Sequence, residues 1–533
     1  MNRPEELEKA EPLKWSPGKG TDVWDLFCAC IRGDLEAVKA LVDQDPALVR
    51  CHYVYRKPLY FAVRENRVAI ADFLLERDPD PTGLAVNDSL KQIARDRGYT
   101  EMQGVLERRL NQLHGASTLG EPVATAIRAG DLAKVQLLLD ERPDRLLAGD
   151  ERGNQPLHWA VMTRQLPMID ELLRRGADIN AKRTDGARPI QLTNGDYHHR
   201  GWRDVPQDHP VTPRAVLDYL RTRGANCDIC TAAHIGDLAR VTELLDQDPG
   251  LANRPSDYVS YYACSGTPLK NAAVAGHLEV VRLMLERGAD PNLPEEGIAP
   301  RGHALYSAAA NGHYEVAKLL LEFGAHPNVE VESSADTLSR VISNGDKKML
   351  ELLCVHGAAR AVHLLAHYND LQTAAAVFAA NPALANDPEA LRSTSSEDFV
   401  RLMLRYQPEL PQRLSVVKSR ELNELLFAHG MNPSRPDWLG ITPLHEIARR
   451  GKVEAAAQFL DHGADLHARD EDICSTPLGW AAKFGQAKMV EFLLQRGAQP
   501  NHPDDPPWAT PLAWATRRGH GEIVELLKSR GAN

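Results

Sequence analysis

The sequence predicts an all-α repeat solenoid of roughly fifteen stacked helix–turn–helix units. Three similar segments begin 34 residues apart, at Thr442, Thr476 and Thr510. The same interval separates three glycines, namely Gly463, Gly497 and Gly531. Self-similarity at about this period is typical of repeats that stack against their neighbours. An aromatic content of 6% fits thin layers in which Leu and Ala fill the space between helices.

The unit that begins at Thr476 carries its own start and stop signals. Thr476 can accept from free N–H groups of the first helical turn, and Pro477 suits the first helical position. Gly485 and Gly497 can end the two helices because glycine adopts the left-handed conformation without strain. The second helix reads AKMVEFLLQRG, and its apolar residues fall on one stripe. The spacing therefore predicts two short helices that pack face to face.

A Gly-Asp pair forms the turn between helices in four other units. Its aspartate can cap the second helix by accepting from a backbone N–H group. The four aspartates are Asp34, Asp131, Asp237 and Asp346. Their recurrence at one position of the unit indicates a structural role and no chemical site.

The TPLGWAA and TPLAWAT blocks, followed by second helices that close on Gly-Ala, resemble the ankyrin repeat. The resemblance covers about residues 21–533 and is clearest in 122–182, 267–328 and 442–533. It implies a curved array whose first helices line a concave face beside projecting finger loops. It also implies binding to a protein, whose identity it leaves open, without a cofactor.

The regularity of the repeat pattern along the sequence predicts how the chain is organised. The predicted parts are a polar flexible tail at 1–20, N-terminal repeats at 21–117, central repeats at 118–329 with an insertion at 193–211, diverged helical repeats at 330–441, and regular repeats at 442–533. Insertions in solenoids fall on one face, which is often the binding face. The decay of the pattern in 330–441 leaves open whether one superhelix continues or a second array begins.

Composition limits the functional classes. A net charge of −11 without a basic stripe gives no support to nucleic-acid binding. No apolar run approaches the ~20 residues of a membrane span, so we expect no membrane insertion. The N-terminus lacks the apolar core of a signal peptide. Eight scattered cysteines favour free thiols in a reducing, cytoplasmic setting.

The fifth position of the TPLGWAA block provides the first candidates for partner binding. It also accepts Glu, Asn and Arg in other units, so it is not expected to be buried throughout. Its tryptophans are Trp159, Trp480 and Trp514. The last two lie in adjacent units and could form an aromatic ladder with Trp508. Two interpretations stay open: the rings pack over neighbouring helices, or they contact a partner, since tryptophan is enriched at binding hot spots.

The finger loops and the insertion provide the remaining candidates, which are also aromatic. Fingers carry Trp438, Trp508, Tyr258, Tyr261 and Tyr262, with Tyr53 and Tyr55 in a further finger, and the insertion carries Tyr197 and Trp202. Exposed aromatic rings on fingers suggest a surface that a partner covers. Alternatively the rings fold back onto adjacent fingers, and the insertion is a tolerated loop.

A metal or thiol site is the main chemical alternative. Cys227 and Cys230 form a CxxC, and Cys230 and His234 are spaced i, i+4. Zinc needs four ligands, and no second CxxC or HxxxH is present. Cys227 also falls at the Thr cap position of its unit. We therefore predict a non-catalytic protein-binding scaffold or adaptor without metal; the alternative is an enzyme or a metal or thiol site in 193–234.

Overall fold

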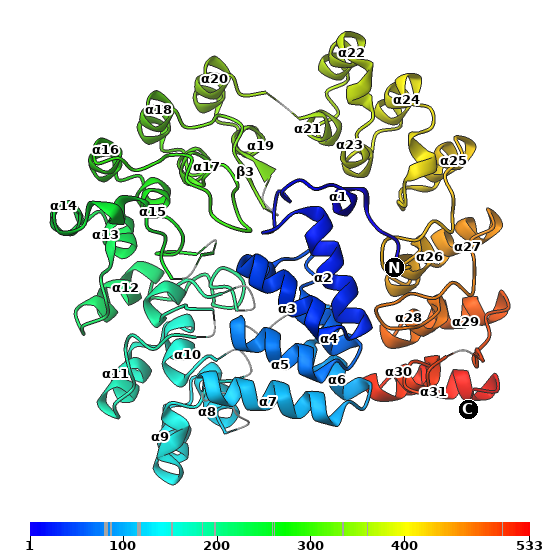
Figure 1. Cartoon of the computed structure of the whole chain (residues 1–533), viewed down its shortest axis with the longest axis horizontal. Coiled ribbons are helices and arrows are strands. Elements are labelled where there is room, and N and C mark those ends of the chain that lie inside the picture. The colour runs from blue at the N-terminus through cyan, green and yellow to red at the C-terminus, as the bar shows by residue number, and fades with distance from the viewer. Residues whose placement is uncertain are drawn as a thin grey trace. The chain divides into compact units, whose positions relative to one another are not determined.

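Helices dominate the structure. A computed structural model describes residues 1–532 apart from 79–83, 86–87, 115–118, 151–152, 184, 197–198, 258, 261, 333–334, 360 and 504. Helices follow one another as stacked pairs joined by tight turns (Figure 1). The predicted all-α repeat solenoid is confirmed. The chain divides into two compact units, Lys9–Ala359 and Met1–Glu8 with Arg360–Asn533.

The unit Lys9–Ala359 holds the N-terminal and central repeats. Its α-helices are α2 (Gly20–Arg32), α3 (Leu35–Gln44), α4 (Pro58–Arg64), α5 (Val68–Arg77), α6 (Leu90–Asp96), α7 (Thr100–His114), α8 (Glu121–Arg128), α9 (Leu132–Glu141), α10 (Pro156–Met162), α11 (Leu166–Arg174), α12 (Pro213–Arg221), α13 (Ile229–Ile235), α14 (Leu238–Gln247), α15 (Pro268–Ala275), α16 (Leu278–Glu286), α17 (Ala304–Ala310), α18 (Tyr314–Glu322), α19 (Thr337–Asn344) and α20 (Lys347–Val355).

The second unit contains the diverged and the regular C-terminal repeats. Its α-helices are α1 (Glu5–Glu8), α21 (Val362–His367), α22 (Leu371–Ala380), α23 (Pro388–Ser393), α24 (Glu397–Tyr406), α25 (Arg420–Ala428), α26 (Pro443–Arg449), α27 (Val453–Asp461), α28 (Pro477–Lys483), α29 (Ala487–Gln495), α30 (Pro511–Arg518) and α31 (Gly521–Ser529). The repeats that the sequence marks as diverged are thus still helical.

Short elements link the helix pairs. The 3-10 helices are η1 (Pro46–Arg50), η2 (Pro143–Leu146), η3 (Pro189–Leu192), η4 (Pro249–Asn253), η5 (Pro382–Ala385) and η6 (Leu410–Arg413). Two strand pairs occur in the described residues, β1 (Leu84–Ala85) antiparallel to β2 (Asp88–Ser89) and β3 (Glu330–Val331) antiparallel to β4 (Ala335–Asp336). The interrupted unit at 188–192 forms η3 in place of a first α-helix.

The predicted helix ends are largely confirmed. Each Gly-Asp aspartate caps the following helix by accepting from the backbone N–H three residues later, at Asp34, Asp131, Asp237 and Asp346. The glycines Gly485 and Gly497 have φ angles of +73° and +97°, which L side chains rarely adopt. The repeat signals therefore fix where the helices stop.

Two residues at the cap position of the repeat do not cap their helices. Cys227 does not cap its helix: α13 begins at Ile229, and the carboxylate of Asp228 accepts from Thr231 N at 2.8 Å. A carboxylate accepts hydrogen bonds far better than a thiol, so the helix start moves by one residue. Thr476 precedes α28 without a side-chain cap bond, whereas Thr510 accepts from Ala513 N at 3.1 Å.

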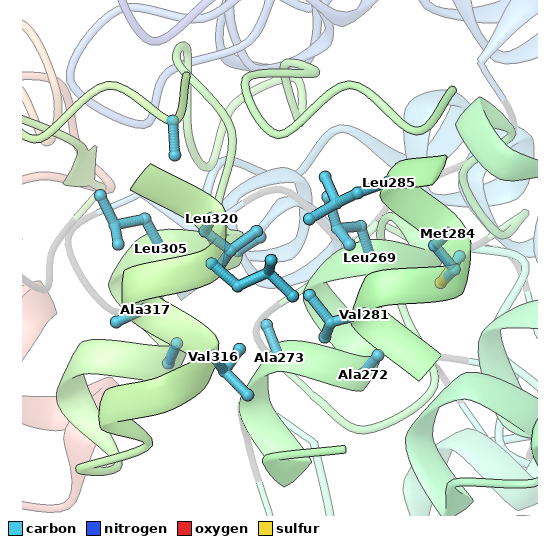
Figure 2. Packing of buried hydrophobic residues seen from close by; sticks show 14 of the residues in the cluster. Leu269, Ala272, Ala273, Val281, Met284, Leu285, Leu305, Val316, Ala317 and Leu320 are labelled. Atoms are coloured by element: carbon cyan, nitrogen blue, oxygen red, sulfur yellow. The ribbon is translucent and has the colours of Figure 1, made fainter. Parts of the chain in front are cut away.

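The core consists of layers between consecutive repeats. The first helices α13, α15, α17 and α19 stack in order, and apolar residues of the second helices pack behind them. Figure 2 shows the layer made by α15 to α18, where small side chains such as Ala273 and Ala317 let the helices approach closely. The layer also contains Leu269, Ala272, Val281, Met284, Leu285, Leu305, Val316 and Leu320.

Residues 1–20, predicted to be a flexible tail, make specific contacts. Asn2 N donates to the Trp438 carbonyl at 3.0 Å, and Leu7 is fully buried. Leu13 N donates to Gly18 O at 3.0 Å, which closes a turn before α2.

Candidate functional site

The insertion at 193–211 is anchored by a buried ion pair. Arg183 donates from Nη1 to Asp196 Oδ2 at 2.6 Å, and both side chains are almost completely buried. The same guanidinium nitrogen lies 2.8 Å from Asn154 Oδ1 in the preceding finger. The Asp196 carboxylate also accepts from His199 N at 2.8 Å. A buried ion pair needs such further hydrogen bonds to offset desolvation, so this geometry fixes Asp196 and the backbone at His199 in the described part of the insertion.

The insertion packs over the first helix α10. The His199 ring contacts the Trp159 ring edge to face, with centroids 5.5 Å apart. Arg128, at the end of the preceding first helix α8, places its guanidinium carbon 4.7 Å from the centroid of the same indole. The indole N–H of Trp159 donates to Asp150 Oδ2 at 3.0 Å. Burial lowers the pKa of His199, so the imidazole is neutral near pH 7.

Within the described part of the insertion, Trp202 is an exposed aromatic residue. Its side chain is 63% exposed, and the guanidinium carbon of Arg200 lies 5.6 Å from its ring centroid. Arg203 beside it forms an ion pair with Asp204 at 2.6 Å. Tyr262 of the next finger, which is half-buried, lies near Arg203. The insertion therefore presents an indole and guanidinium groups beside a tyrosine of the neighbouring finger.

Four of the predicted tryptophans lie in the core. Trp480 is 0% exposed, and Trp514, Trp159 and Trp438 are also buried. The indole N–H of Trp480 donates to Asp470 Oδ2 at 2.8 Å, and that of Trp514 donates to Ser475 Oγ at 2.9 Å. Buried rings offer no face to a partner, so the packing alternative describes these residues and the partner-contact alternative does not.

The predicted ladder of Trp480, Trp514 and Trp508 forms in part: Trp514 contacts Trp508, whereas Trp480 has other ring partners. Trp480 contacts His445 and Phe484, with centroids 5.5 and 6.0 Å apart. Trp514 contacts Trp508 edge to face at 6.0 Å. Trp508 is half-buried, so this finger residue folds back onto its own repeat. Tyr197, Tyr258 and Tyr261 lie outside the described residues.

The finger at 256–266 is organised by a buried lysine that the sequence analysis did not single out. Lys270 is 2% exposed, and its Nζ donates to the carbonyls of Tyr262 and Ser265, both at 3.1 Å. Burial lowers the pKa of Lys270. Nearby, Glu295 Oε1 accepts from Thr267 N at 2.8 Å. In this chain a neutral residue usually occupies the fourth position of the block. A lysine at that position is therefore the sequence signal that could have identified Lys270.

The CxxC region offers little reactive sulfur. Burial raises the pKa of Cys227 and raises that of Cys264 to about 12. The pKa of Cys230 is also raised, first by burial. A protonated thiol is a poor nucleophile and a poor metal ligand. Among the described residues, no group of three or more His, Cys, Asp or Glu side chains is arranged to hold a metal ion.

Comparison with known proteins agrees with the repeat architecture. A family model described as "Ankyrin repeats (3 copies)" matches residues 104–183, 229–331, 416–504 and 476–533, which together exceed half of the chain. Palmitoyltransferase akr1 of Aspergillus oryzae is 42% identical over 68 residues, which are 13% of this chain and 9% of that protein.

Two other relatives match longer segments. Probable E3 ubiquitin-protein ligase XBOS32 of Oryza sativa subsp. japonica is 30% identical over 199 residues, 33% of this chain and 39% of that protein. Ankyrin repeat and KH domain-containing protein mask-1 of Caenorhabditis elegans is 27% identical over 242 residues, 43% of this chain and 8% of that protein. The matches thus span well under half of each relative. No helix in the described part of the chain is long and apolar enough to cross a membrane.

Proposed function

The chain belongs to the ankyrin-repeat family, and we propose that it is a non-catalytic protein-binding scaffold or adaptor. The insertion of the central repeats, together with the finger at 256–266, provides the partner-binding surface in this proposal. The partner is a protein, not a nucleic acid, and no membrane insertion is involved. Eight free cysteines support a reducing compartment such as the cytoplasm.

The exposed indole of Trp202 on an anchored loop carries this proposal. Tryptophan and arginine are the residues most enriched at binding hot spots, and here they lie side by side at Trp202 and Arg200. The Arg183–Asp196 pair fixes the loop, which reduces the entropy that binding would cost. Because the Trp202 side chain is 63% exposed, it buries little apolar area and contributes little to stability.

Bond chemistry is not part of the proposal. The names palmitoyltransferase and ubiquitin-protein ligase belong to relatives of which this chain matches 9% and 39%. Burial raises the pKa values of the CxxC thiols and so keeps them protonated, which works against nucleophilic thiol chemistry there.

Affinity capture with the full chain tests the proposal. The bait is compared with its Trp202→Ala variant and with a matched control, Phe323→Ala, which removes another exposed aromatic ring, 44% exposed. We expect Trp202→Ala to lose specific partners that both the unchanged chain and Phe323→Ala retain, with unchanged circular dichroism melting. An identical set of captured proteins for all three baits would contradict the proposal.

A further inference from the structure

A contact between distant parts of the unit Lys9–Ala359 suggests a second functional surface. Residues 50–57 before α4 and the segment 13–17 lie against two fingers that follow about 250–320 residues later in sequence. These are the finger at 295–297, before α17, and the finger at 330–332, before α19. Neighbouring repeats do not produce such a contact, because each repeat of a solenoid normally touches only the next.

The contact joins opposite charges. Lys14 forms an ion pair with Glu330, and Arg50 Nη2 lies 3.6 Å from Glu296 Oε2. The Tyr55 hydroxyl donates to Glu332 Oε1 at 2.6 Å. All three acidic residues thus come from the later fingers, and their partners come from the N-terminal region.

The backbones of the two regions also approach closely. A Cβ atom placed on Gly297 would lie 3.7 Å from the Trp15 carbonyl oxygen and 3.9 Å from His52 Nε2, an ordinary van der Waals distance. His52 lies within electrostatic reach of both Glu296 and Glu332, although burial dominates and lowers its pKa. The contact is therefore an interface and does not depend on one long side chain.

The finger before α4 is bent in a way that presents Tyr55. Tyr53 and Arg56 exchange backbone hydrogen bonds at 3.1 and 3.0 Å, which closes a two-residue turn. Val54 and Tyr55 at its centre have φ angles of +47° and +62°, an uncommon conformation for residues other than glycine. Tyr55 is 61% exposed apart from its contact with Glu332.

We propose that these residues form an electrostatic clasp: an acidic docking surface made by Glu296, Glu330 and Glu332, occupied by residues 14–55 of the same chain. The ion pairs lie at the surface, with side chains about 38–55% exposed. Exposed pairs are weak and are screened by salt. The clasp is therefore reversible, and an added basic peptide should compete with Lys14 and Arg50 for the acidic surface. This surface is distinct from the insertion and does not depend on the function proposed for it.

Zero-length carbodiimide cross-linking of the full chain tests the clasp, because it joins an amine to a carboxylate only when they touch. We expect a Lys14–Glu330 cross-link at low salt that is lost at 1 M salt, since the Debye length falls from roughly 30 Å at 0.01 M to roughly 3 Å at 1 M. The internal control is Lys39–Glu36, whose Nζ and Oε1 lie 2.8 Å apart within one helix. Absence of the Lys14–Glu330 product at low salt, with the control product present, would overturn the proposal.

Three further comparisons decide who occupies the surface. The Glu296→Gln/Glu332→Gln variant leaves both cross-linked residues in place and should lower the Lys14–Glu330 yield severalfold. An acetylated tetra-arginine peptide, which carbodiimide cannot couple through its side chains, should also lower the yield, whereas acetylated tetra-serine at equal ionic strength should not. An unchanged yield in either experiment contradicts the docking surface. A product that joins isotopically light to heavy chains would show a second copy as the occupant and would overturn the intramolecular clasp.

Discussion

The indole N–H of Trp480 donates to the carboxylate of Asp470, with Nε1 and Oδ2 2.8 Å apart. Trp159 and Asp150 repeat this arrangement in the other compact unit, at 3.0 Å. In both cases the aspartate begins a finger and the tryptophan lies on the first helix that follows. Because the carboxylate accepts from the indole N–H group, the large ring can be buried without leaving that group unsatisfied.

Replacement of Trp480 should therefore destabilise the C-terminal repeats. Trp480→Phe keeps most of the apolar volume but leaves the buried Asp470 carboxylate with one donor fewer, which costs about 1–3 kcal/mol. Denaturant unfolding monitored by circular dichroism measures this loss. Trp202→Ala is the matched control, because an exposed substitution usually changes stability by less than about 0.5 kcal/mol. Equal stability of the two variants would contradict the core assignment.

The stability of the C-terminal repeats should depend on the charge of Asp470. Burial raises its pKa to about 6, while hydrogen bonds from Trp480 and Ile473 N oppose that rise. The unfolded carboxyl releases its proton near pH 3.9. Between these values the folded state holds more protons, so its stability falls as pH rises, by at most about 1.4 kcal/mol per pH unit.

Asp470→Asn isolates this effect because an amide does not ionise in that range and can still accept from the indole. The quantity to follow is the difference in free energy of unfolding, unchanged chain minus variant. This difference should fall between pH 4 and pH 6 and then level off. Groups common to both proteins cancel in this difference. A difference that stays constant from pH 4 to pH 6.5 would show that Asp470 ionises normally.

Loss of one partner of the Arg183–Asp196 pair should release the insertion. Asp196→Ala leaves a buried guanidinium with fewer acceptors, and breaking a buried pair in this way costs about 3–5 kcal/mol. Hydrogen exchange should increase at 193–211, which limited proteolysis can confirm. The double variant Arg183→Met/Asp196→Leu removes both charges and should recover part of the stability. Unchanged exchange in Asp196→Ala would contradict the anchoring role.

Gly236 and Gly345 allow strain and steric clash to be separated. Both end a first helix, with φ angles of +77° and +72°. A Cβ on Gly236 would lie 2.7 Å from the His277 ring, whereas none of the described atoms lies within 4 Å of one on Gly345. Gly345→Ala should cost only the left-handed penalty of about 1–2 kcal/mol. Gly236→Ala should cost more, since it also disturbs the His277 contact with the His234 carbonyl at 3.1 Å. Equal losses in urea unfolding would show that His277 moves freely.

Much of the fold could be predicted because helix ends are local chemistry. A Gly-Asp turn needs a residue that tolerates positive φ, and it needs a carboxylate three residues before a free N–H group. Both requirements can be recognised from adjacent residues in the sequence. Cys227 shows the limit of such reading: it occupies the cap position of its repeat, yet the helix starts one residue later and Asp228 caps it by accepting from Thr231 N.

The site could be predicted less well because burial depends on distant residues. Trp480 and Trp202 look alike in the sequence, and the difference is that Trp480 has Asp470 to accept its N–H while Trp202 projects from the insertion. An aspartate nine or ten residues before a first-helix tryptophan is a signal that separates the two. The sequence does not reveal the buried role of Lys270, because its acceptors are backbone carbonyls, which every residue has.

By itself, the sequence determined the helices, their ends and their stacking order, because period, caps and glycines act over a few residues. Only the tertiary structure decided which aromatic rings are buried, how Arg183 and Asp196 fix the insertion, and that Tyr55 reaches Glu332. These contacts join segments between 13 and 277 residues apart. Only the folded chain brings these side chains together, so no single stretch of sequence encodes the contacts.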